Sequence, residues 1–112
     1  MVATSHRHQD AIRAAKQAIG SDEAISDMSE VFKVLGDPTR LKILLALSKG
    51  ELCVYDIAQA LGVTESAVSH QLRLLKALRL VRQRKEGRMV FHALDDEHID
   101  DLIRVAKRHA AE

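Results

Sequence analysis

The C-terminal segment of the chain carries four side chains of the kinds that bind divalent metals. Asp96 and His98 lie at the start of the segment DDEHIDDLIRVAKRHAAE, and His109 and Glu112 lie at its end. Carboxylate oxygens and imidazole nitrogens are common protein ligands of Zn(II) and related ions. These residues raise the question of whether the segment binds a metal.

The spacing indicates that one copy of the segment cannot form such a site. In a helix, His98 and His109 project from nearly the same face, because eleven residues make about three turns. They then lie about 16 Å apart along the axis, whereas the ligands of one metal lie ~2 Å from it. Two antiparallel copies would bring Asp96 and His98 of one chain to His109 and Glu112 of the other. A simpler interpretation is that these charges only complement the helix dipole.

Composition predicts one small globular domain without enzymatic activity. The chain has 112 residues, of which 46% are hydrophobic and 3% aromatic, so its core must consist mainly of aliphatic side chains. A chain this short often gains stability by dimerising, and its apolar terminal helices are natural partners. The single cysteine, Cys53, excludes an intrachain disulfide and fits the cytoplasm. The sequence offers no nucleophile paired with a base and no open metal site.

Charge is distributed unevenly, although the net charge is only +1. Residues 64–88 contain seven basic and two acidic side chains, whereas residues 89–112 contain three basic and six acidic ones. A basic segment favours a polyanionic partner, and an acidic one disfavours it. The middle of the chain is therefore expected to bind nucleic acid, and the tail to do something else.

The apolar periodicity and the turn residues predict a mainly α-helical chain with a small β-hairpin. Residues 1–20 are expected to form a loose arm and a short helix that begins near Gln9 and ends at Gly20. Residues 21–112 are expected to form a winged helix-turn-helix domain with a C-terminal helix for dimerisation and metal binding. Its first helices should lie within 22–36 and 37–50, each ended by a glycine.

A helix-turn-helix motif is predicted in VYDIAQALGVTESAVSHQLRLLKALRLV. Two short amphipathic helices flank a turn at Gly62 and Val63, and Thr64 begins the second helix. We expect this second helix to enter the major groove of DNA. The side chains expected to contact bases are Ser66, Ser69 and His70, and those expected to hold the backbone are Gln71 and Arg73.

A basic hairpin is predicted to follow as a wing. In LVRQRKEGRMVFHAL, two alternating segments flank the turn KEGR. Arg84, Lys85 and Arg88 are expected to meet phosphates or the minor groove. His92 lies in the second segment, and the pattern assigns it no role.

The segments VLGDPTRLKILLAL, ELCVYDIAQALGVTESAVSHQLRLLKALRLV and RKEGRMVFHAL together resemble the ArsR/SmtB family of metal-sensing repressors, over about residues 28–112. The spacing D-x-H-x10-H-x2-E resembles the C-terminal zinc site of the SmtB-like branch, at Asp96, His98, His109 and Glu112. The resemblance implies a homodimer that binds operator DNA without metal and releases it with metal. It also implies that metal-bound His109 hydrogen-bonds to a main-chain carbonyl near Arg79. Four nitrogen and oxygen ligands suit Zn(II), with Co(II) as a substitute and Ni(II) a poorer fit.

The chain departs from the family pattern at one place. Arsenic, cadmium and lead sensors of the family carry C-V-C-D before the recognition helix, where this chain reads Cys53-Val54-Tyr55-Asp56. A site rich in thiolates is therefore not expected, and Cys53 is interpreted as a buried core residue. Three alternatives remain: a secondary metal site of Cys53 with His6 or His8, a nickel or cobalt sensor in which those histidines extend the C-terminal site, and a DNA-binding regulator that senses no metal.

Overall fold

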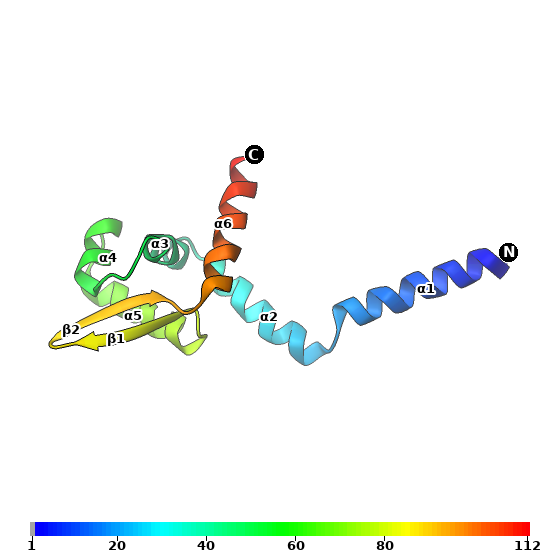
Figure 1. The fold of residues 1–112 in the computed structure, drawn as a ribbon, viewed down its shortest axis with the longest axis horizontal. Coiled ribbons are helices and arrows are strands. Elements are labelled where there is room, and N and C mark those ends of the chain that lie inside the picture. Colours follow the sequence, from blue (N-terminus) through cyan, green and yellow to red (C-terminus); the bar gives the residue numbers. More distant parts are fainter. Residues whose placement is uncertain (1) are drawn as a thin grey trace. The chain divides into compact units, whose positions relative to one another are not determined.

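The structure is a computed structural model that describes the backbone of residues 2–112 and the side chains of residues 6–112 (Figure 1). It contains two compact units, one ending at Lys33 and the other spanning Val34–Glu112. The first unit holds α1 (Val2–Ile19) and most of α2 (Asp22–Leu35). None of the described helices is both long enough and apolar enough to cross a membrane.

Glycine and serine separate the two helices of the first unit as the sequence predicts. Gly20 has φ +76°, which ends α1 in the left-handed conformation, and the Ser21 hydroxyl accepts a hydrogen bond from Ala24 N at 3.1 Å. The expected loose arm is wrong, however, because α1 is continuous from Val2 rather than beginning near Gln9. Residues 2–19 include no Gly or Pro that would interrupt a helix.

The compact second unit begins at Val34, and the division of the chain into residues 1–20 and 21–112 stays a prediction. The side chains near the end of α2 differ in their exposure. Met28 and Phe32 are each 55% exposed, so they add nothing to the core of the single chain. Val34, by contrast, is buried.

The second unit is built from α3 (Pro38–Leu47), α4 (Val54–Leu61), α5 (Glu65–Ala77), the strands β1 (Val81–Glu86) and β2 (Met89–Leu94), and α6 (Glu97–Ala111). Asp37 begins α3 by accepting a hydrogen bond from Arg40 N at 3.0 Å, and Pro38 occupies the first turn. The core is aliphatic, as the composition requires. Its most deeply buried side chains are Ile43, Leu44, Ile57, Val68, Leu75, Leu80 and Val81.

A tight corner joins α4 and α5 into the predicted helix-turn-helix. Gly62 ends α4 with φ +71°, and its N–H donates to Ala58 O at 2.9 Å. The Thr64 hydroxyl then accepts a hydrogen bond from Ala67 N at 3.1 Å at the start of α5. Both ends of the turn are therefore fixed by the residues that the sequence analysis singled out.

The hairpin is an antiparallel pair whose register runs from Val81 opposite Leu94 to Glu86 opposite Met89. A second contact fixes its base. Leu52, in the loop before α4, exchanges two backbone hydrogen bonds with His92 at 3.0 and 2.8 Å. β2 is therefore hydrogen-bonded to β1 on one side and to Leu52 on the other, and the tip of the hairpin projects from the second unit (Figure 1).

Candidate DNA interface and metal-binding helix

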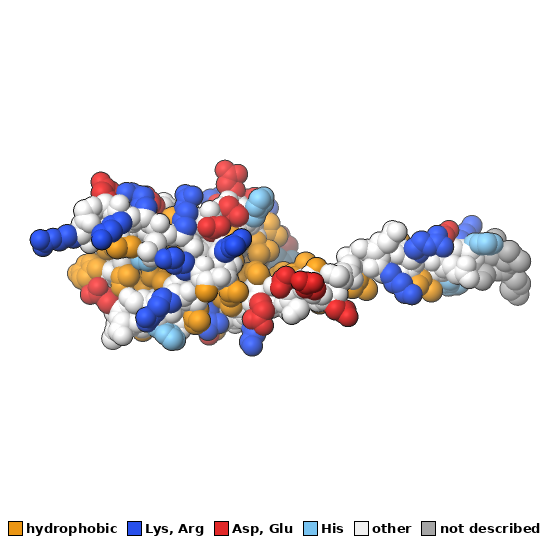
Figure 2. Space-filling view, turned by 90° about the horizontal axis from the view of Figure 1, so that it is seen from below, with side chains coloured by type: hydrophobic (Ala, Val, Ile, Leu, Met, Phe, Trp, Pro, Cys, Tyr) orange, Lys and Arg blue, Asp and Glu red, His pale blue; other side chains and the backbone are white. Residues whose placement is uncertain are grey.

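The polar face predicted for α5 is present. Val68, Leu72 and Leu75 are buried against the core, which leaves Ser66, His70 and Arg73 exposed and Ser69 half-buried. Basic side chains are spread over the second unit in the space-filling view, including its left end, where the hairpin tip lies in Figure 1 (Figure 2). Small polar and basic groups on one helical face can reach base edges and phosphates.

Gln71 has a structural partner that the sequence did not reveal. Arg40 Nε of α3 donates a hydrogen bond of 2.8 Å to Gln71 Oε1, and both side chains are half-buried. The two residues are 31 positions apart, so no local pattern indicates the contact. Gln71 therefore fixes α5 on α3, and its contact with the DNA backbone stays a prediction.

Arg84 of the hairpin is held by two carboxylates, one from Glu51 in the loop before α4 and one from Glu86 of β1. Its Nε lies 3.0 and 2.9 Å from the two oxygens of Glu51, its Nη1 lies 2.8 Å from Glu86, and its guanidinium lies over Phe91 at 4.8 Å. The hydrogen bonds to Glu86 and Glu51 raise the pKa of Arg84. Its charge is thus paired with two carboxylates of the same chain, although its side chain is 51% exposed.

The other two basic residues predicted for the wing differ from Arg84. Lys85 and Arg88 are exposed, and neither forms an ion pair with an acidic side chain among the described residues. Their charges are therefore available to a polyanion, which makes them stronger candidates for phosphate contacts than Arg84.

Asp96 begins α6 and keeps one oxygen near a histidine. Its Oδ1 accepts a hydrogen bond from Ile99 N at 3.1 Å, and its Oδ2 lies 3.5 Å from His98 Nδ1. The hydrogen bond from Ile99 is the main cause that lowers the pKa of Asp96, and His98 acts in the same direction. Asp96 therefore has a structural role at the start of α6, and this role leaves its second oxygen beside His98.

One face of α6 carries both histidines together with the half-buried Leu102 and the exposed Val105. At about 100° per residue, the side chains on this face lie within about 40° of a common line; they are those of His98, Leu102, Val105, His109 and Glu112. His98 is 91% exposed and Val105 is 59% exposed. Among the described side chains, no three His, Cys, Asp or Glu residues come together as metal ligands. One chain thus presents two separated ligand pairs.

The residues of the possible secondary metal site lie in different units. Cys53 is buried as predicted, at the residue before α4, and its Sγ lies 3.1 Å from Asp56 Oδ2. His6 and His8 are exposed on α1. A site that joins them stays a prediction.

His92 is a site residue that sequence reasoning missed. Its side chain is only 6% exposed, although it lies on β2, which pairs with the basic and mostly exposed strand β1. Burial lowers the pKa of His92 below its usual value of 6.5, and the charge of Lys76 adds to this effect. The neutral imidazole is therefore the form that the folded protein prefers.

We expect the free energy of unfolding to fall as the pH drops below about 6.5, because the unfolded chain then binds a proton that folded His92 resists. The loss should stop below the pKa of His92 in the folded protein, because His92 is then protonated in both the folded and the unfolded chain. Urea denaturation between about pH 8 and pH 5 measures it. In a His92→Gln variant this part of the pH dependence should disappear; an unchanged profile would contradict the assignment.

The known proteins that are similar to this chain are transcriptional regulators. Residues 37–83 match the family described as "Bacterial regulatory protein, arsR family". The chain is 43% identical to a transcriptional repressor SmtB homolog of Synechocystis sp., over 94% of this chain and 80% of that protein. It is 41% identical to a cadmium resistance transcriptional regulatory protein CadC homolog of Staphylococcus aureus, over 100% of this chain and 93% of that protein.

Solved structures support the same fold. A homodimeric winged helix-turn-helix DNA-binding domain from Mycobacterium bovis matches with a TM-score of 0.77 at 31% identity, over 83% of this chain and 89% of that one. The solution structure of apo-NmtR matches with a TM-score of 0.72 at 38% identity, over 82% of this chain and 77% of that one. The predicted winged helix-turn-helix fold is confirmed, and the relatives are regulators rather than enzymes.

Proposed function

Because the chain belongs to the ArsR family of bacterial winged helix-turn-helix transcriptional regulators, we propose that it is a metal-responsive repressor. As a metal-free homodimer it binds operator DNA, and it releases the DNA when Zn(II) binds. As a DNA-binding regulator it acts in the cytoplasm. The observation that carries the metal part is one face of α6, on which His98 at one end and His109 with Glu112 at the other flank the exposed side chain of Val105.

DNA binding uses α5 and the hairpin. Ser66 and His70 reach base edges from the exposed face of α5, and Arg73 and the half-buried Ser69 contact the DNA backbone. Lys85 and Arg88 at the hairpin tip contact phosphates. Two protomers related by a two-fold axis present two such helices, so the operator has two half-sites on successive major grooves.

The homodimer forms through the terminal helices. Val105 of α6 and Met28 and Phe32 of α2 are more than half exposed in the single chain. Burial of such side chains against a second copy removes apolar surface from water, which stabilises the dimer. The homodimeric Mycobacterium bovis domain supports this assembly.

The ligand set fits Zn(II). Asp96 and His98 come from one protomer, and His109 and Glu112 come from its partner, so each dimer has two equivalent sites. When bound, Zn(II) supplies a tetrahedral link between the protomers. Asp96 Oδ2 already lies beside His98, and its Oδ1 keeps capping α6. Tyr55 stands where a second thiol would be, so Cys53 is the one thiol in the sequence, which disfavours a soft-metal site at α4.

Regulation follows from how α6 is attached to α5. Asp95, directly before the cap of α6, donates its N–H to Leu80 O at 3.0 Å. Leu80 in turn donates its N–H to Leu75 O of α5 at 2.9 Å, and Arg79 between them has φ +59°. A change in the packing of α6 on its partner therefore reaches the end of the recognition helix. The coupling between metal and DNA is reciprocal.

A mobility-shift titration of operator DNA with and without Zn(II) tests the proposal. We expect zinc to weaken binding by wild-type protein and to leave binding by a His98→Ala/His109→Ala variant unchanged. Typical coupling free energies of ~1–3 kcal/mol correspond to a loss of about 5- to 150-fold. Zinc-insensitive wild-type protein would favour a regulator that senses no metal. A response to Ni(II) that is lost when residues 1–9 are deleted would favour the nickel sensor.

A further inference from the structure

A cavity of about 380 Å³ lies between α5 and the hairpin. On the helix side its polar lining consists of Ser69, Arg73 and Lys76, and on the hairpin side it consists of Gln83 and His92. Val54, Leu72 and Val90 complete the walls. The cavity is therefore a cleft between the two elements that carry the predicted DNA contacts.

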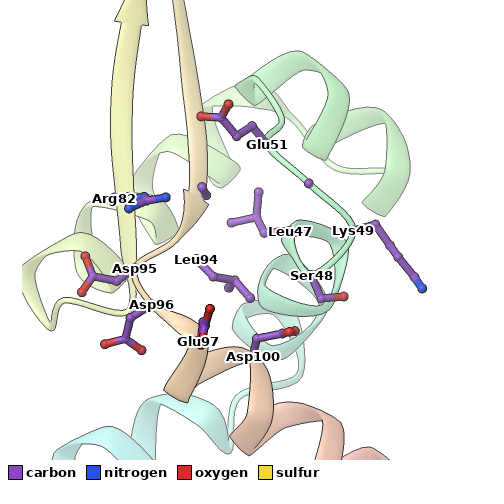
Figure 3. A pocket seen from close by; sticks show the side chains of 12 residues that line it. Leu47, Ser48, Lys49, Glu51, Arg82, Leu94, Asp95, Asp96, Glu97 and Asp100 are labelled. Carbon is purple, nitrogen blue, oxygen red and sulfur yellow. The ribbon is translucent and has the colours of Figure 1, made fainter.

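The charge of this cleft suits an anion. Arg73 and Lys76 are exposed cations, and no carboxylate is among its lining residues. A larger cavity of the second unit, about 610 Å³, has an excess of carboxylates over cations in its lining (Figure 3). Its acidic lining residues are Glu51, Asp95, Asp96, Glu97 and Asp100, and its basic ones are Lys49 and Arg82. A negatively charged ligand is therefore expected to bind in the cleft between α5 and the hairpin rather than in the acidic cavity.

The cleft also offers neutral hydrogen-bond donors. Ser69 contributes a hydroxyl and Gln83 an amide, and both can donate to an oxyanion. His92 is 94% buried yet lines the cleft, and none of the hydrogen bonds among the described side chains involves its imidazole. A ring nitrogen that finds no protein partner can bind a ligand or its water instead.

The cleft lies beside the face of α5 that is proposed to contact bases. Ser69, Arg73 and Lys76 lie within about 40° of one line along α5. This line runs between the buried face of the helix and the exposed side chains of Ser66 and His70. A groove-bound helix has phosphates along such flanks, since base contacts are made by its central face.

We propose that the cleft between α5 and the hairpin is a phosphate-binding site that holds one backbone phosphate of the operator in each half-site. Arg73 and Lys76 neutralise the phosphate, and Ser69 and Gln83 donate hydrogen bonds to its oxygens. Free inorganic phosphate has the same chemistry and is the other possible source of the ligand. The proposal rests on the DNA contact of α5 and adds Lys76, Gln83 and the cleft to it.

The salt dependence of DNA binding tests the site with metal-free, full-length protein. Loss of one phosphate contact per protomer should reduce the slope of log K against log salt by about 2 per dimer, because each contact contributes about 0.9. We expect this of Lys76→Ala on both operator and random DNA. Lys49→Ala removes the same charge from the acidic cavity and should leave the slope unchanged. Gln83→Leu should weaken binding with little change in slope.

A second measurement locates the phosphate. Operators in which single phosphates are replaced by neutral methylphosphonates should show one position per half-site that weakens wild-type binding but has little effect on Lys76→Ala. Such a position supports the proposal. Equal slopes for Lys76→Ala and Lys49→Ala, with no such position, would overturn it. Wild-type protein that failed to bind operator DNA would count against the DNA contact of α5 itself.

Inorganic phosphate distinguishes the two sources. At constant ionic strength, with chloride as the comparison, we expect no saturable shift of the Gln83 and His92 amide resonances in the absence of DNA. The opposite result would be a saturable shift that Lys76→Ala abolishes, together with competition between phosphate and operator. It would mean that the cleft binds an oxyanion, but that the ligand is free phosphate rather than a phosphate of the operator.

Discussion

A mixed dimer of one His98→Ala chain and one His109→Ala chain is expected to bind about one Zn(II) ion tightly, whereas each mutant homodimer binds none. The two histidines lie about 16 Å apart along α6, and no three ligands meet within the described part of one chain. If each site combines ligands of both chains, one site of the mixed dimer lacks both histidines and the other keeps all four ligands.

The zinc content of the purified mixed dimer measures this directly. Lys107→Ala changes an exposed residue of the same helix that is not a ligand, so its homodimer should keep two ions. Both mutant homodimers should still bind operator DNA without metal, because their α5 and hairpin are intact. A count near zero in the mixed dimer would mean that each chain forms its own site.

Changing Ser66 and His70 to Ala together is expected to reduce discrimination between operator and random DNA by at least about 30-fold, because two lost base contacts cost ~2–6 kcal/mol in each half-site. Each lost base contact costs ~1–3 kcal/mol on the operator and almost nothing on random DNA. These two positions are the most informative, because both are exposed whereas Ser69 is half-buried and lines the phosphate cleft.

Competition binding with operator and random DNA at one salt concentration provides the measurement. Arg88→Ala is the matched comparison, since the loss of a phosphate contact should weaken both DNAs equally and flatten the salt dependence. An equal loss on both DNAs for the Ser66/His70 variant would count against base contacts by this face.

Local signals predicted the elements that position these sites. Asp37 and Thr64 begin α3 and α5, and Gly20 and Gly62 end helices, because each needs only its own neighbours to act. The burial pattern of α5 likewise follows from helical periodicity. The fold class could therefore be predicted from the sequence.

Contacts between distant residues could not be predicted in this way. Glu51 with Arg84, and Leu52 with His92, join positions that are brought together only when the loop before α4 meets the hairpin. For that reason the sequence pattern predicted only a DNA contact for Arg84 and no role for His92. In the folded chain Arg84 is paired with two carboxylates, and His92 is buried.

The hydrogen bond between Arg40 and Gln71 has a consequence for engineering. It anchors the middle of α5 to α3 through side chains that need not read sequence. A library of altered repressors could therefore vary residues 66 and 70 freely while keeping residues 40 and 71, and still retain the placement of the helix. Variants with new operator preferences should be recovered far more often from such a library than from one that also randomises Gln71.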